Sequence, residues 1–159
     1  MLNAGAEQVR GITACFSTAT LAIGGTTSKV KFTAPNGAGI DFSINGIMYH
    51  KADADNVWTL SGDTMADASD CIFLLCLNAS GTMSVVQGTV ILSADIASGA
   101  KVLNWPQYDA DVCPVGAVRV TTDGATFVPG TTALNSNNYD TYINLSTVPM
   151  APLTSSVTS

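Results

Sequence analysis

The sequence contains few charged residues. Lysine, arginine, aspartate and glutamate together make up 11% of its 159 residues, compared with roughly 25% in an average soluble domain. A domain that faces solvent on every side normally covers its surface with charged side chains. The shortage therefore favours a protein whose faces are covered by neighbouring subunits, with a secreted β-domain of low charge as the alternative.

Positive charge is especially scarce. Only six residues are lysine or arginine, the net charge is −6, and the basic residues are scattered apart from the pair Lys29 and Lys31. Binding to phosphate groups, whether of nucleic acid or of lipid, needs clustered positive charge. No apolar run approaches the ~20 residues of a membrane-spanning helix. We therefore expect neither a nucleic-acid partner nor a membrane.

Residues suited to acid–base catalysis are almost missing. The chain has one histidine, His50, and one glutamate, Glu7, whereas acid–base catalysis needs a positioned, titratable group. A Ser–His–Asp arrangement stays open because serine and aspartate are abundant, although no GxSxG nucleophile motif is present. We expect a protein that is not an enzyme and uses no cofactor.

The acidic residues do not form a recognisable metal site. Asp53 and Asp55 have the i, i+2 spacing of a calcium loop, but Val57 and Trp58 stand where that loop needs an oxygen ligand and a glycine. Zinc is disfavoured because no second histidine and no close cysteine pair is present. We interpret the two aspartates as part of a turn and expect no metal.

The four cysteines do not form a disulfide pattern. None lies in a CxxC pair, and Cys71 and Cys76 are an odd number of residues apart on one expected strand, so their side chains point to opposite faces. The first 25 residues do not read as a secretion signal, because Glu7 and Arg10 interrupt them. We expect free cysteines and assembly in a reducing cytoplasm.

Turn residues divide most of the chain into short segments of alternating polarity. Tight turns are expected at Asn45-Gly46, Ser80-Gly81 and Asp123-Gly124. Residues 71–78 form an apolar run typical of a strand buried on both faces, and residues 93–114 are irregular with room for one helical turn. With roughly eight to ten short strands, the pattern predicts an all-β antiparallel sandwich or barrel, of jelly-roll or immunoglobulin-like type.

Three regions follow from this pattern. Residues 1–27 are apolar in patches but lack strand alternation, and we interpret them as an extended N-terminal arm that a partner orders; a short helix packed on the domain is the alternative. Residues 28–149 form the β-domain. Residues 150–159 form a polar C-terminal tail.

The clearest expected hairpin is AVRVTTDGATFV at residues 117–128. Its Asp123-Gly124 centre predicts a two-residue turn that fixes the pairing of the flanking strands. Val118 and Val120 then share one face, and Arg119 lies on the other. We expect Arg119 to be solvated or paired across an interface.

Two segments resemble small virion structural proteins of tailed bacteriophages. They are DFSINGIMYHKADADNVWTL (residues 41–60) and CPVGAVRVTTDGATFVPGTTAL (113–134), and the closing element NLSTVP (144–149) resembles them as well. The matching positions are Asn45, Gly46, Tyr49, Lys51, Asp55, Asn56, Cys113, Pro114, Gly116, Val118, Phe127, Pro129, Gly130, Thr131, Thr132 and 144–149. The likeness covers most of residues 40–149 and leaves the arm unassigned.

This resemblance implies a structural role on the outer surface of the phage head, which is assembled in the bacterial host cytoplasm. Proteins of this kind often decorate or cement the head as homotrimers that bind the major capsid protein. Low charge and an apolar arm fit such a role. The contact candidates are the apolar residues of the arm: Leu2, Val9, Ile12, Phe16 and Leu21.

A tail, collar or fibre component that recognises the host is the alternative. Loops 61–70, 95–111 and 133–141 would then carry the contact, because loops often host recognition. Four aromatic residues fall in or beside these loops: Trp105, Tyr108, Tyr139 and Tyr142. A secreted carbohydrate-binding domain is a third possibility.

Overall fold

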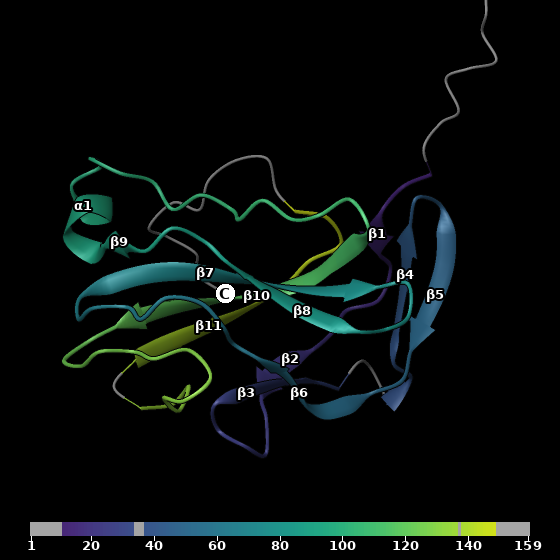
Figure 1. Ribbon diagram of the computed structural model, residues 1–159, viewed down its shortest axis with the longest axis horizontal. Coiled ribbons are helices and arrows are strands. Elements are labelled where there is room, and N and C mark those ends of the chain that lie inside the picture. The colour runs from purple at the N-terminus through teal and green to yellow at the C-terminus, as the bar shows by residue number, and fades with distance from the viewer. Residues whose placement is uncertain (1–10, 34–36, 137, 149–159) are drawn as a thin grey trace, which may run out of the picture.

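The computed structural model describes residues 11–33, 37–136 and 138–148, and they form β-strands and one short helix (Figure 1). All strand pairs among these residues are antiparallel, which confirms the predicted all-β antiparallel sandwich. The elements are β1 (Ala14–Cys15), β2 (Leu21–Ile23), β3 (Lys29–Phe32), β4 (Ile40–Ile44), β5 (Ile47–Lys51), β6 (Ala54–Thr59), β7 (Ser69–Asn78), β8 (Met83–Gln87), β9 (Ile91–Leu92), α1 (Ser93–Ala97), β10 (Val112–Thr122) and β11 (Asn138–Asn144).

The strands form three sheets. The large sheet has the order β11-β10-β7-β8, with β9 added beside β7. The hairpin sheet has the order β1-β4-β5, and the third sheet has the order β2-β3-β6. The hairpin sheet and α1 lie at opposite ends of the molecule (Figure 1).

The main core lies between one face of the large sheet and the two smaller sheets. Phe73 and Leu75 of β7 meet Phe32, Phe42 and other apolar residues there, all fully buried. Burying a side chain of this size stabilises the fold by about 1.5–3 kcal/mol. Burial of these apolar side chains is the main contribution that holds the three sheets together.

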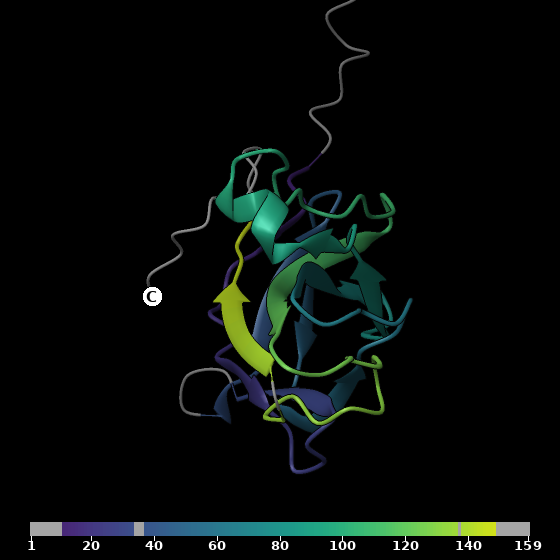
Figure 2. The same cartoon turned by 90° about the vertical axis from the view of Figure 1, so that its left-hand side faces the viewer.

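A second apolar cluster covers the other face of the large sheet. Ile72, Leu74 and Cys76 of β7 contact Ile91 of β9 and Leu103 of the segment that follows α1. Figure 2, which looks from the end that carries α1, shows the helix in front. Both faces of β7 are therefore buried, as the continuous apolar run predicted, and the expected helical turn is α1.

The boundary predicted between arm and domain does not match the strand pairing. Ala14 pairs with Ser43 of β4, and Leu21 pairs with Phe32 of β3, so residues from 11 onward are joined to the domain. Strand alternation is weak there because β1 and β2 are only two and three residues long. Leu2, Val9 and the C-terminal tail lie outside the described residues.

The predicted hairpin at residues 117–128 is wrong in both its second strand and its type of turn. Val112–Thr122 is a single strand, β10, with β7 on one side and β11 on the other, so no edge is left for residues 125–128. Phe127 instead bridges Met65 through two backbone hydrogen bonds of 2.9 and 3.0 Å. Gly124 has a φ of +83° and Asp123 does not have a positive φ, whereas a type I′ turn needs both.

Candidate interaction surface

The outer face of the hairpin sheet is built from rows of residues on β1, β4 and β5. One row is Ala14–Ser43–Met48. The neighbouring row, Cys15–Phe42–Tyr49, points to the core, where the Phe42 and Tyr49 rings stack with centroids 5.6 Å apart. Because side chains alternate along a strand, Ile12 and Phe16 lie on the same outer face as Ala14.

Large apolar side chains are exposed on this outer face. The exposed fraction is 59% for Ile12, 55% for Phe16 and 59% for Met48. We call these three residues the apolar face. Ile47, at the hairpin turn, is also 61% exposed but lies on the opposite side of β5 from Met48. Single exposed apolar residues are ordinary, but these lie on one face of one sheet, on either side of the central strand β4. Several exposed apolar residues on one face mark a candidate interaction surface.

Hydrogen bonds and close packing hold β1 in place. Gly11 lies against the backbone of Gly46, where a Cβ on Gly11 would be only 2.2 Å from the Gly46 Cα. The Gly46 amide donates to the Ile12 carbonyl (3.2 Å), and the Phe16 amide donates to the Asp41 carbonyl (2.8 Å). These contacts therefore fix the backbone at Ile12 and Phe16, the residues on either side of β1.

A histidine–aspartate pair borders the apolar face. His50 Nδ1 lies 2.8 Å from Asp41 Oδ1, and both side chains are more than half exposed. An ion pair so open to solvent contributes little to stability. Among the described residues no serine or cysteine side chain is hydrogen-bonded to the imidazole, so the geometry gives a Ser–His–Asp mechanism no support.

A groove of about 330 Å³ lies beside β1 and continues from Phe16. The Cys15 amide donates to the Ser146 carbonyl (2.9 Å), which joins two of its lining residues. Burial raises the pKa of the Cys15 thiol, which donates to the Ser17 carbonyl (3.0 Å). The lining residues are Cys15, Phe16, Ser17, Thr18, Asn144, Leu145 and Ser146.

No protein-family model, curated protein or solved structure matches this chain. In the part of the chain that the structure describes, no helix is long and apolar enough to cross a membrane.

The arm candidates occupy different environments. Ile12 and Phe16 belong to the apolar face, whereas Leu21 of β2 is buried in the main core. Leu21 packs onto Gly116, where any side chain would collide with Leu21 Cδ1. Leu21 is therefore not available for a surface contact.

The structure does not bring the loop aromatics together. Trp105 packs against the second cluster, and Tyr108 is 39% exposed on the same segment. Tyr142 of β11 packs against the main core on the opposite face of the large sheet, and burial raises its pKa to about 12. Of Tyr139 only the backbone is described, paired with Thr121.

Met48 and Ile47 are surface residues that the sequence pattern does not reveal. Alternation along the segment IMYH (residues 47–50) places Ile47 and Tyr49 on one face, which is the face expected to be buried. Met48 then falls on the polar side of the alternation, and an apolar residue there was the available signal. Ile47 shares the inner face but lies at the hairpin turn, beyond the core that covers Tyr49.

The two aspartates considered for a metal point to different loops. Asp53 Oδ1 accepts a hydrogen bond from the Gly39 amide (3.0 Å), and Asp55 Oδ1 accepts one from the Gly25 amide (3.0 Å). No cluster of three or more potential metal ligands occurs in the described part of the chain. Both carboxylates therefore act as acceptors for turn amides.

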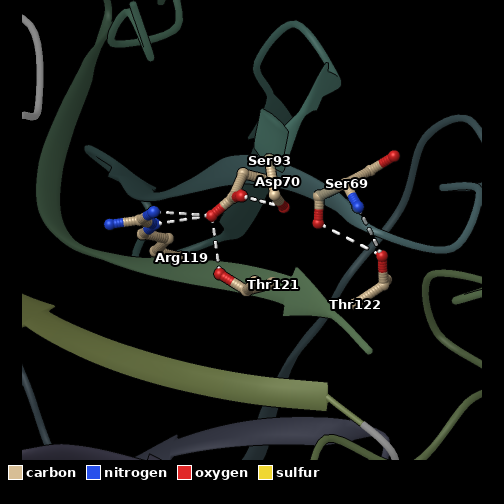
Figure 3. A network of polar contacts seen from close by, with 6 residues as sticks. All are labelled: Ser69, Asp70, Ser93, Arg119, Thr121 and Thr122. Atoms are coloured by element: carbon tan, nitrogen blue, oxygen red, sulfur yellow. Dashed lines mark hydrogen bonds and ion pairs between the residues drawn. The ribbon is translucent and has the colours of Figure 1, made fainter. Parts of the chain in front are cut away.

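Arg119, expected to be solvated or paired across an interface, is paired within the chain. Its Nε and Nη2 atoms donate to Asp70 Oδ1 at 2.9 and 2.6 Å (Figure 3). Thr121 and Ser93 donate to the same carboxylate, each at 2.6 Å. The Asp70 side chain is almost fully buried, so this network joins β7, β10 and α1 and is not an open site.

Proposed function

We propose that this protein is a structural component of a tailed-bacteriophage virion, and specifically a head decoration protein. It would bind the lattice of the major capsid protein on the outer surface of the head and stabilise it. The observation that carries the proposal is the apolar face, presented by a strand that is held rigidly. The resemblance of residues 40–149 to virion proteins supports the same role.

Stabilisation of the head follows from mass action. A protein that binds the mature lattice and not its separated subunits shifts the equilibrium toward the lattice. Modest contacts suffice when they are repeated over many symmetric copies. A homotrimer over capsomer junctions, which the resemblance implies, would multiply the contact further.

Binding to expanded capsid shells tests the proposal. The Ile12→Ser, Phe16→Ser double variant removes the apolar side chains on either side of β1, and we expect its affinity for shells of the cognate major capsid protein to fall about tenfold or more. The control is Leu92→Ser, Val102→Ser, which removes two exposed apolar side chains elsewhere on the molecule. Cosedimentation with shells measures both.

The outcome separates the possibilities. Equal binding by wild-type protein and the β1 variant, with both folded, would show that the apolar face does not contact the capsid. No binding of wild-type protein to expanded shells would contradict the decoration role itself.

A tail, collar or fibre component is the second candidate. It is favoured by the exposed side chains of Val102 and Tyr108 on the segment that follows α1. The copy number in purified virions distinguishes the two roles. Hundreds of copies fit head decoration, and a handful fit a tail or fibre part.

A further inference from the structure

The β5 strand forms a free edge of the hairpin sheet. The strand order of this sheet is β1-β4-β5, so among the described residues β5 has a hydrogen-bonded neighbour on one side only. The two-residue turn makes Ile44–Ile47 a hydrogen-bonded pair of the ladder. Because such pairs alternate along an antiparallel ladder, Tyr49 also directs its amide and carbonyl to β4. Met48 and His50 direct their amides and carbonyls to the other side, away from the sheet.

These outward backbone groups have no partner within the described chain. No hydrogen bond to the amide or carbonyl of Met48 or His50 is formed there. An edge of this kind is a template for another strand. β5 also lacks proline and has no bulge in its pairing with β4, which are two of the devices that block edge pairing.

The exposed side chains of β5 distinguish it from the edge strands β8 and β11 of the large sheet. Ile47 and Met48 are both about 60% exposed. The edge strand β8 carries no large apolar side chain with such exposure. At the edge strand β11, the Asn144 side chain accepts a hydrogen bond from the Leu21 amide of β2 (3.4 Å).

We propose that β5 pairs in antiparallel fashion with β5 of a second copy of this chain, about a two-fold axis at Tyr49. Two three-stranded hairpin sheets then join edge to edge. Met48 lies opposite the partner's His50, and each such pair exchanges both backbone hydrogen bonds. This axis is the one that pairs every residue of β5.

The charges of the strand favour this orientation. Lys51 ends β5, whereas the Asn45-Gly46 turn at the other end is uncharged. Antiparallel pairing places Lys51 opposite the partner's Ile47, whose apolar side chain can contact the lysine stem. Parallel pairing would instead place like charges side by side. A second copy that pairs in antiparallel fashion therefore brings apolar and charged side chains together without placing like charges opposite each other.

The pairing surface is small. A strand of five residues offers much less than the roughly 1,600 Å² buried in a standard stable interface. We therefore expect a weak, reversible dimer that forms at high protein concentration. The inference does not rest on capsid binding, since it concerns the isolated protein.

Sedimentation of the full chain from micromolar to millimolar concentration tests the association. We expect reversible dimers of the wild-type protein. Met48→Pro removes one outward amide and should reduce the association constant at least tenfold. Met48→Ala, which keeps the amide, should reduce it less. Circular dichroism establishes that both variants are folded.

Cross-linking tests the register. With Met48 and His50 hydrogen-bonded across the axis, the two Tyr49 Cα atoms would be about 4.5 Å apart, within disulfide range. Tyr49→Cys should form disulfide-linked dimers on mild oxidation, because the four native cysteines are buried. Ser84→Cys, exposed on the edge strand β8, is the matched control.

Two results would overturn the proposal. The first is a wild-type protein that stays monomeric at millimolar concentration. The second is an oligomer that Met48→Pro leaves unchanged and in which Tyr49→Cys cross-links no faster than Ser84→Cys. Loss of capsid binding alone would bear on the proposed function and not on this pairing.

Discussion

Asp70 shows how a single residue can tie three elements together. Its carboxylate is almost fully buried and accepts hydrogen bonds from Arg119, Thr121 and Ser93 (Figure 3). Thr121 lies directly opposite Asp70 in the pairing of β10 with β7, and Arg119 lies opposite Ile72. A buried charge with this many donors is strongly dependent on each partner.

Removal of Arg119 should destabilise the protein severely. Arg119→Met leaves the Asp70 carboxylate buried without its cation, and we expect a loss of about 3 kcal/mol or more in the free energy of unfolding. Urea denaturation measures it. Asp70→Asn combined with Arg119→Met should be less destabilised than Arg119→Met alone, because no unpaired charge remains.

The exposed pair Asp95–Lys101 supplies the control for this prediction. The two side chains are joined at 2.8 Å but open to solvent. Lys101→Met should therefore change the free energy of unfolding by less than about 1 kcal/mol. Equal effects of Lys101→Met and Arg119→Met would show that burial of the Asp70 pair does not matter.

Asp55 should make stability depend on acid pH. The hydrogen bond from the Gly25 amide lowers the pKa of Asp55 below its ordinary value of 3.8. The stabilisation is therefore fully present above pH 3.8 and is lost as the pH falls through the lowered pKa. Asp55→Asn should remove this part of the pH dependence of the melting temperature; an unchanged acid profile would assign it to other carboxylates.

At the scale of elements, Gly46 joins the β4–β5 hairpin to β1. Gly46 and Gly124 both have a φ of +83°. A Cβ on Gly46 would lie 2.8 Å from the Gly11 Cα, whereas a Cβ on Gly124 would meet nothing within 4 Å. The two turns are thus matched in backbone strain and differ in packing.

Gly46→Ala should therefore cost more stability than Gly124→Ala. For Gly124→Ala we expect about 1–2 kcal/mol from the left-handed conformation alone. Gly46→Ala adds the collision with Gly11 and should also increase hydrogen exchange at the Phe16 amide, which donates to Asp41. Similar costs and unchanged exchange would mean that β1 does not depend on this contact.

Local patterns predicted the elements better than their partners. The Asn45-Gly46 turn and the buried run of β7 were predictable because their signals lie within a few residues. The second side of β10 was not predictable, because β11 reaches it only after a long connection. Residues 125–128 do not form the second strand of the predicted hairpin, because β11 occupies that side of β10.

The candidate surface was only partly predictable. Ile12 and Phe16 stood out as apolar residues without a buried pattern, but Met48 joins them only through the pairing of β1 with β4 and of β4 with β5. Leu21 looked equivalent in the sequence, but it is buried against Gly116, which lies far away along the chain. Which apolar residues remain exposed is therefore decided by non-local pairing.

The whole molecule combines low charge with one strongly apolar face. With only six basic and twelve acidic residues, little charge is available to attract a partner over long range. The apolar face itself is bordered by the hydrogen-bonded Asp41–His50 pair. Contact through this face should therefore be driven by removal of apolar surface from water.

Capsid binding should accordingly be insensitive to salt. Binding steered by charge weakens steeply as ionic strength rises, because the Debye length falls from about 10 Å at 0.1 M to about 3 Å at 1 M. We expect the affinity for expanded shells to change less than about threefold over this range, with the negative heat capacity change typical of apolar burial. Titration calorimetry measures both quantities.

Asp41→Asn should bind with the same salt response as the wild-type protein. A drop of tenfold or more in affinity with salt would instead assign the contact to charged residues outside the apolar face.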